Sequence, residues 1–184
     1  METGKHNYSY QQIHIDVARN STDDFNPFHD QKKWHRIYRN PFGMPIALGF
    51  QIEALVEHLV TLYREESGEN KLIDDNHLNY SNFQFTFADA VRPGESFQIE
   101  IKKSINRISE TGQLANRIAV KKKEGLVLLG YQRESKTPLC MPDADFSQFV
   151  DLDTADDRSW IADQRYFFKR KFMSTGHGKN FLAA

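Results

Sequence analysis

The sequence has little cysteine and no long apolar run. One cysteine, Cys140, occurs in 184 residues, which excludes an internal disulfide framework and a multi-cysteine metal site. Its apolar neighbours, Leu139 and Met141, are typical of a partly buried thiol rather than a nucleophile. No apolar run approaches the roughly 20 residues that cross a bilayer, and residues 1–6 lack the apolar core of a signal peptide. We therefore expect a soluble cytoplasmic protein.

An excess of charge of either sign is also missing. Lys and Arg number 24, Asp and Glu number 25, and the net charge is -1, so nothing indicates a nucleic-acid or membrane partner. The seven histidines show neither His-x3-His nor His-Glu-x-x-His spacing, and no Gly-x-Ser-x-Gly elbow occurs. We expect no metal and no other cofactor.

Apolar residues make up 39% of the chain, enough for a core. Residues 49–63 are apolar around most of a helical circumference, which predicts one buried helix with Phe50 and Leu59 inside. Before it, the alternation of apolar residues over 13–17 predicts a short strand. After it, the polar stretch 64–79 predicts a loop.

The apolar period then changes to two, most clearly at Phe83, Phe85 and Phe87. Short turns between the segments predict an antiparallel meander. Such a sheet buries its apolar face by wrapping the helix, so the predicted fold is α+β, with an antiparallel sheet around one long central helix. Strands are expected near 82–88, 96–104, 114–122 and 126–134, with turns at 92–95, 109–112 and 123–125.

Asp24 and His29 are the sharpest candidates for chemistry. They flank an Asn-Pro turn, which can aim a carboxylate and an imidazole at one small volume. Hydration of a conjugated double bond uses such a pair to move protons. Gly49 opens the helix, and its backbone N–H could stabilise the negative charge that gathers on a thioester oxygen. Taken singly, Asp24 reads as a turn residue and His29 as a surface histidine.

Three segments together resemble one family. Residues 24–29 (DFNPFH) resemble the Asp-x-Asn-Pro-x-His signature of MaoC-like (R)-specific enoyl-CoA hydratases and related dehydratases. Residues 42–49 (FGMPIALG) resemble the family's segment that opens the central helix, with Leu48 where the family usually has His. Residues 91–95 (VRPGE) resemble its turn before a strand. The order matches over about residues 10–135, and the stretch from His29 to Phe42 is slightly longer than usual.

The resemblance implies a hotdog fold and a lyase, an (R)-specific enoyl-thioester hydratase or 3-hydroxyacyl-thioester dehydratase of fatty acid metabolism. It implies that Asp24 and His29 are catalytic and that Gly49 supplies the oxyanion contact. The expected site loop and pocket residues are Asn26, Pro27, Pro45, Leu48 and Phe50. Leu48 and the unexplained C-terminal segment keep an alternative open: a hotdog thioesterase, or a non-catalytic acyl-binding subunit of a dehydratase complex.

The expected partners are an acyl-CoA or acyl-carrier-protein substrate and a second hotdog unit. One curled sheet leaves an open edge, so we expect a homodimer or pairing with a second hotdog domain. Lys121, Lys122 and Lys123 read as a solvated strand end, or alternatively as a contact for the phosphates of the carrier.

Two regions are predicted along the chain. Residues 1–139 form the hotdog domain. Residues 140–184 are an acidic linker and C-terminal segment, with seven Asp between Asp143 and Asp163. The aromatic residues between Trp160 and Leu182 are the alternative sign that further structure begins there.

Overall fold

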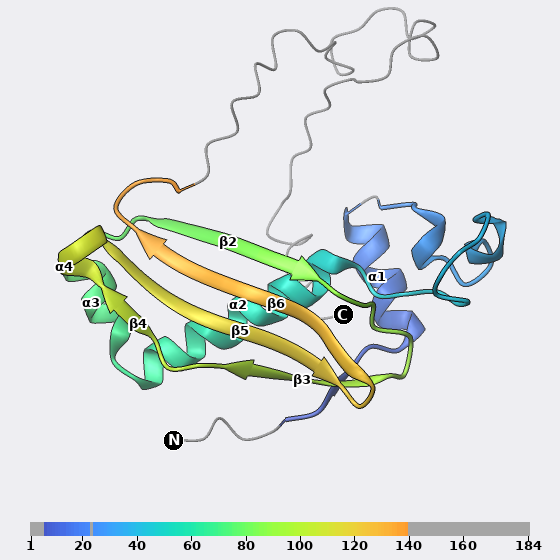
Figure 1. Ribbon diagram of the computed structural model, residues 1–184. Coiled ribbons are helices and arrows are strands. Elements are labelled where there is room, and N and C mark those ends of the chain that lie inside the picture. The colour runs from blue at the N-terminus through green and yellow to red at the C-terminus, as the bar shows by residue number, and fades with distance from the viewer. Residues whose placement is uncertain (1–5, 23, 140–184) are drawn as a thin grey trace, which may run out of the picture.

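The computed structural model describes residues 6–22 and 24–139 (Figure 1). Cys140 and the predicted segment 140–184 lie outside the described residues. In the described part the helical elements are α1 (Gln12–Thr22), the 3₁₀ turns η1 (Pro27–His29) and η2 (Trp34–Arg36), α2 (Gly49–Glu66), α3 (Glu69–Asp75) and α4 (Ile108–Thr111). The strands are β1 (Tyr8–Ser9), β2 (Tyr80–Phe87), β3 (Ser96–Ile101), β4 (Ile105–Arg107), β5 (Gln113–Lys122) and β6 (Gly125–Ser135).

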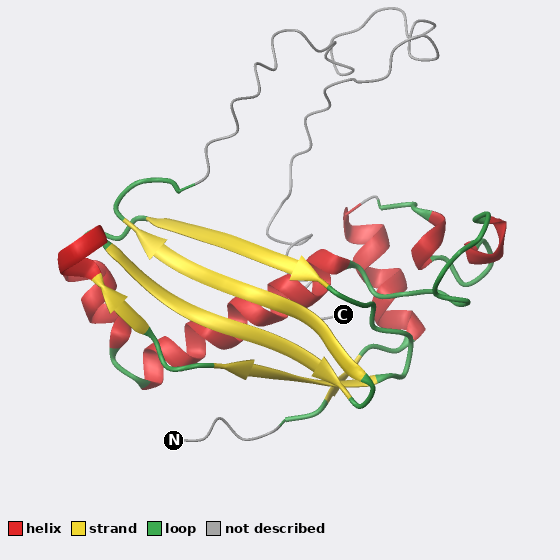
Figure 2. Cartoon of the chain, in the orientation of Figure 1, coloured by secondary structure: helices red, strands yellow, loops and turns green. Residues whose placement is uncertain are grey.

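The strands form one antiparallel sheet in the order β1-β3-β5-β6-β2, with β4 paired to β5. Figure 2 shows the sheet curving along the length of α2, while α1 and the 3₁₀ turns gather beside the first residues of that helix. This confirms the predicted fold, one long helix wrapped by an antiparallel sheet. The predicted meander order is wrong, because β2 pairs with β6 and not with β3, the next strand along the chain.

The core lies between α2 and the concave face of the sheet. Ile52, Val56 and Val60 follow one another at a spacing of four, so they share one face of the helix, and all three are buried. They belong to the same core cluster as Ile118 and Leu128 of the two central strands. Burial of each such side chain stabilises the fold by about 1.5–3 kcal/mol. This packing fixes the position of α2 on the sheet, and therefore the position of its first residue.

The prediction that α2 is buried around most of its circumference is wrong at its first turn. Phe50 is 73% exposed, while Leu59 is partly buried. The helix packs on one sheet only, so the face turned away from the sheet keeps its apolar side chains in solvent in a single chain.

The prediction of a strand over 13–17 is also wrong, because these residues belong to α1. Ile15 and Ala18 are buried at a helical spacing of three, whereas Ile13 is 63% exposed. Alternate apolar residues over so short a stretch fit either period, and tertiary packing decides between them.

Two predicted connections contain helix. The expected loop 64–79 includes the last turn of α2 and the whole of α3, and the expected turn 109–112 is mostly α4. The polar composition of residues 64–79 predicted a loop, because the sequence does not show that Arg64 is buried in a pair with Glu134, far along the chain. The predicted strand 96–104 ends at Ile101, and pairing with β5 resumes at β4. The other three predicted strands are confirmed with nearly the expected bounds.

Candidate active site

The loop that follows α1 is shaped by its own short polar side chains. Asp24 accepts a hydrogen bond from the Asn26 N–H at 3.0 Å, and the Asn26 side-chain oxygen accepts one from the Phe28 N–H at 3.1 Å. These side-chain turns replace regular backbone pairing. Pro27 then begins η1, where its fixed φ suits the first helical position. The loop thereby places Asp24 and His29 on the same side.

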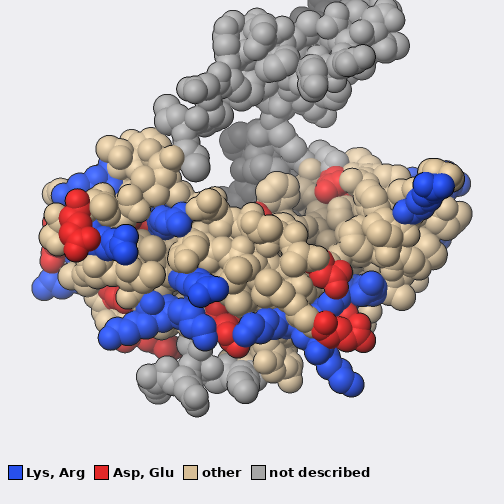
Figure 3. Space-filling view, viewed as in Figure 1, with Lys and Arg blue, Asp and Glu red and all other residues tan. Residues whose placement is uncertain are grey.

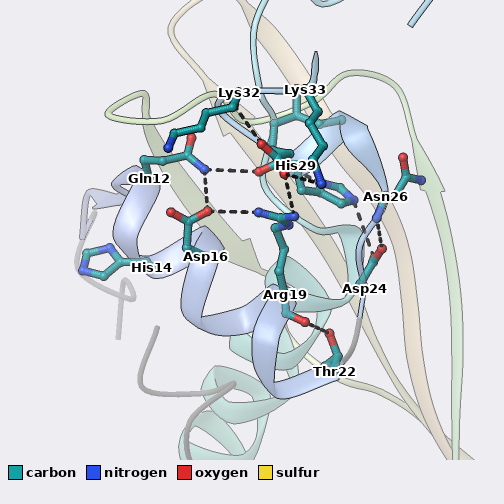
Figure 4. A network of polar contacts seen from close by, with 12 residues as sticks. Gln12, His14, Asp16, Arg19, Thr22, Asp24, Asn26, His29, Lys32 and Lys33 are labelled. Atoms are coloured by element: carbon teal, nitrogen blue, oxygen red, sulfur yellow. Dashed lines mark hydrogen bonds and ion pairs between the residues drawn. The ribbon is translucent and has the colours of Figure 1, made fainter. Parts of the chain in front are cut away.

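His29 is held in one tautomer. Its Nδ1 lies 2.8 Å from the carbonyl oxygen of Ile46, and a carbonyl only accepts, so Nδ1 carries the proton. Nε2 then faces Oδ2 of Asp24 at 3.7 Å (Figure 4). That separation exceeds a hydrogen bond. The His29 side chain is 11% exposed and that of Asp24 is 35% exposed, so the pair opens toward solvent on the carboxylate side.

Side chains of helix α1 hold this loop in place through hydrogen bonds. Gln12 donates from Nε2 to the carbonyl oxygen of His29 at 3.2 Å. Arg19 donates to Asp16 at 3.3 Å (Figure 4). It also donates to Asp30 at 3.1 Å, and its carbonyl oxygen accepts the N–H of Asp24 at 3.0 Å. Arg19 therefore contacts the loop on both sides of His29.

Asp30 is the ionised partner in this support. A hydrogen bond from the Lys32 backbone N–H, together with the charge of Arg19, holds the pKa of the Asp30 carboxyl below its usual value. Gln12, Arg19 and Asp30 were not among the residues expected at the site. The sequence carries a signal for the first two: in a helix over 12–22, Gln12, Asp16 and Arg19 share one face.

A pocket of about 280 Å³ lies beside His29 at the first residue of α2. Its walls come from the segment before α2, from the first turns of α2 and from the segment after β2. Gly49 faces Phe87 closely, since a Cβ at this glycine would lie 3.2 Å from the ring. The lining residues are His29, Phe42, Ile46, Ala47, Gly49, Ile52, Phe87, Ala88, Asp89, Ala90 and Val91.

The N–H groups in the first turn of α2 point toward the N-terminal end of the helix, where the pocket lies. The first N–H groups of a helix have no intrahelical acceptor, and Leu48 caps α2 without a side-chain hydrogen bond. The carbonyl of Leu48 accepts the N–H groups of Gln51 and Ile52. The Gly49 N–H precedes both, at the positive end of the helix dipole.

The structure brings some of the expected site residues together and separates others. His29 and Gly49 both line the pocket. Asp24 stands against His29, and Asn26 and Pro27 shape the loop, as described above. The remaining three lie outside the pocket lining: Pro45 is buried, Leu48 is 2% exposed within the core, and Phe50 is 73% exposed.

One residue that lines the pocket, Asp89, belongs to an ion cluster around Lys122. Lys122 on β5 is buried and contacts Asp89 at 2.9 Å and Glu95 at 3.1 Å. The hydrogen bond from Lys122 holds the pKa of Asp89 below its usual value. The reading of 121–123 as a solvated strand end is therefore wrong at Lys122, and this amine is turned inward rather than toward a carrier phosphate. Lys121 pairs with Glu100 at 2.9 Å.

Within residues 6–22 and 24–139, no group of three or more His, Cys, Asp and Glu side chains is placed to hold a metal ion. The same part of the chain contains no helix long and apolar enough to cross a membrane.

No protein-family model and no curated protein sequence matches this chain. Solved structures do match. The (R)-hydratase from A. caviae involved in PHA biosynthesis has a TM-score of 0.50 and 14% identity, over 71% of this chain and 90% of that one. The truncated HadBC (3R-hydroxyacyl-ACP dehydratase) complex from Mycobacterium tuberculosis gives 0.48 and 12%, over 70% and 88%. The MaoC-like dehydratase from Rhodospirillum rubrum gives 0.44 and 12%, over 73% and 90%. The chain shares the hotdog fold of the A. caviae protein.

Proposed function

We propose that this hotdog chain is a MaoC-like hydratase/dehydratase that acts on an enoyl or 3-hydroxyacyl thioester, with the (R)-specificity that the resemblance implies. One observation carries the proposal: with its Nδ1 bonded to the Ile46 carbonyl oxygen, His29 turns Nε2 toward the Asp24 carboxylate at 3.7 Å, beside the pocket. A ring nitrogen and a carboxylate oxygen at that separation can share one water molecule.

In the hydration direction, Asp24 and His29 hold the attacking water between them. One group takes a proton from the water as its oxygen bonds to the β-carbon of the enoyl thioester. The proton held by the pair then passes to the α-carbon, and the dehydration direction reverses these steps. The bond from His29 Nδ1 to Ile46 lasts through both protonation states, because Nδ1 is a donor in each.

Gly49 is the proposed oxyanion contact. Negative charge gathers on the thioester oxygen as the water adds, and a helix N-terminus stabilises such charge through its N–H groups and its dipole. Gly49 and His29 line the same pocket. The acyl group would lie against Phe42, Ile52 and Phe87, which line it as well.

A second hotdog unit is the proposed partner. Strand β2 is an edge of the sheet, and along it Phe83 and Phe87 are each 42% exposed. An apolar sheet edge of eight residues can pair with a strand of another chain. We propose a second copy of this chain, or a separate hotdog domain, at this edge.

The test uses the purified chain with enoyl-CoA thioesters of several chain lengths. Loss of the conjugated absorbance without release of free thiol is the expected result. Thiol release would instead select the thioesterase. Neither reaction, with an enoyl thioester still bound, would select the non-catalytic subunit.

A further inference from the structure

Residues 31–39 carry a dense charge of one sign. This segment, which we call the basic loop, contains Lys32, Lys33, Arg36 and Arg39 and no carboxylate, although the whole chain has a net charge of -1. All four cations are exposed. Figure 3 shows Lys and Arg side chains at the end of the molecule where η1 and η2 lie.

Both ends of the basic loop are anchored at the pocket. It begins two residues after His29 and ends three residues before Phe42, and both of these line the pocket. A trans chain spans at most roughly 3.6 Å per residue, so Cα of Lys32 lies within roughly 11 Å of Cα of His29. The same bound applies to Arg39 and Phe42. The first and last cations of the basic loop, Lys32 and Arg39, therefore lie near residues that line the pocket.

The loop has a defined path. The Asn40 side chain donates to the carbonyl oxygen of Trp34 at 3.3 Å and accepts from the Phe42 N–H at 2.9 Å. The Phe42 ring meets the Phe28 ring edge-on at 5.8 Å. These contacts tie the return of the loop to η1, so its charges keep their place beside the site.

An aromatic ring stands in solvent among these charges. Tyr38 is 83% exposed, and the guanidinium of Arg39 lies 5.2 Å from the centre of its ring. Arg39 has φ +53, a conformation that non-glycine residues seldom adopt. An exposed ring beside an arginine is suited to stacking on a nucleobase.

Other cations near the pocket are already paired. Lys122 contacts two carboxylates and Arg19 contacts Asp16 and Asp30. In the basic loop one such contact occurs among the described residues, between Lys33 and Asp30 at 3.8 Å. The loop therefore keeps a surplus of positive charge.

We propose that the basic loop binds the nucleotide end of a coenzyme A thioester, with Lys32, Lys33 and Arg36 on the phosphates and Tyr38 with Arg39 on the adenine. This rests on the proposed function, because a thioester seated beside His29 must extend its carrier out of the pocket. Coenzyme A offers several phosphates and a base, which match both features of the loop. The arm of a carrier protein offers one phosphate and no base.

The experiment compares two enoyl thioesters with the same acyl group, one on coenzyme A and one on pantetheine, which lacks phosphates and adenine. The loop variant is Lys32→Gln/Lys33→Gln/Arg36→Gln, and the control is Lys123→Gln, an exposed lysine on the turn between β5 and β6. The loop variant removes three exposed charge contacts, each of modest strength, so we expect it to raise KM for the coenzyme A thioester about tenfold. We expect kcat, and KM for the pantetheine thioester, to stay the same. Tyr38→Ala should raise KM for the coenzyme A thioester alone.

Calorimetric binding of free coenzyme A separates this inference from the proposed function. Binding that the loop variant weakens and the control leaves intact supports the inference even if no hydration occurs. Hydration with equal KM for both thioesters would overturn the inference while leaving the proposed function in place. Absence of coenzyme A binding would also overturn it, as would a loop variant that impairs only a carrier-protein thioester.

Discussion

The two ends of α2 each carry a polar cluster, and they are built in opposite ways. At the last turn, Arg64 donates from Nη1 to Glu134 and from Nε to Asn116 at 3.1 Å. Ser81 donates to the other oxygen of Glu134 at 2.6 Å. The side chains of Arg64 and Glu134 are only 5% and 6% exposed. This cluster satisfies most of its members internally and joins α2 to the sheet.

At the first turn, similar groups are held apart. Nε2 of His29 and the Asp24 carboxylate stand 3.7 Å from each other, and a pocket lies beside them. Two polar groups kept in reach of one another but without a mutual hydrogen bond can both contact a third molecule. A closed cluster of this kind stabilises the fold, whereas we propose that the open one serves chemistry. Each prediction below tests one of these two roles.

The largest expected effect is on turnover at the open cluster. Asp24→Asn keeps the oxygen that accepts from Asn26 but removes the carboxylate. His29→Asn keeps an amide N–H that can donate to Ile46 but removes Nε2. Each single variant should lose about 10²–10⁴-fold in hydration rate, while thermal unfolding stays close to that of wild type. A variant that retains nearly full turnover would remove that residue from the mechanism.

His29→Asn is preferred to His29→Ala because His29 is buried and bonded. Truncation to alanine leaves the Ile46 carbonyl without its donor, at a cost of about 1–3 kcal/mol. The activity loss would then be mixed with unfolding.

The next effect is on stability at the closed cluster. Arg64→Met leaves the Glu134 carboxylate buried without its cation, which should lower the free energy of unfolding by about 3–5 kcal/mol. The folded fraction should keep its turnover. Chemical denaturation measures the loss, and the double variant Arg64→Met/Glu134→Leu should recover part of it. A loss below 1 kcal/mol would mean that the cluster behaves like a surface pair.

A smaller effect is expected where the helix meets the pocket. Gly49→Ala places a Cβ 3.2 Å from the Phe87 ring, which must give way by a few tenths of an ångström. Turnover should fall several-fold, and stability should change by no more than about 1 kcal/mol, the glycine-to-alanine difference in a helix. Combining it with Phe87→Leu should restore the space and much of the turnover. Unchanged kinetics in Gly49→Ala would place the acyl group elsewhere.

The smallest expected effect is on stability at acidic pH. The hydrogen bond from Lys122 lowers the pKa of Asp89 below its usual value. A lowered carboxyl pKa contributes stability above the unfolded pKa, and that contribution is lost as pH falls through the folded pKa. Asp89→Asn should therefore lose slightly less stability than wild type between about pH 5 and pH 3. Because Asp89 is 40% exposed, the difference should be small. Identical acid curves would mean that solvent screens the pair completely.

The sequence predicted the elements whose pattern is local. The strict alternation of Phe83, Phe85 and Phe87 predicted β2, and the dense apolar run after Gly49 predicted α2. The Asp24–His29 spacing predicted the pair that the structure places face to face. Each of these depends on neighbours a few residues away, which a single sequence records.

The features that the sequence could not predict depend on distant partners. The sequence pattern places Arg64 in a loop, because it does not show the contact with Glu134, seventy residues later, that buries the Arg64 side chain. Leu48 was expected in the pocket, but its side chain is buried in the core. The pocket wall from Phe87 to Val91 meets Gly49 because the N–H of Ala47 donates to the carbonyl of Val91 at 2.8 Å. No local pattern specifies that bond.

The most direct test of the account is the double variant Asp24→Asn/His29→Asn, assayed beside both single variants for enoyl-thioester hydration, with circular dichroism as the folding control. If the two groups act as one unit on one water, the double variant should be about as slow as either single one. Losses that multiply in the double variant would contradict the account, because they would show that Asp24 and His29 act independently.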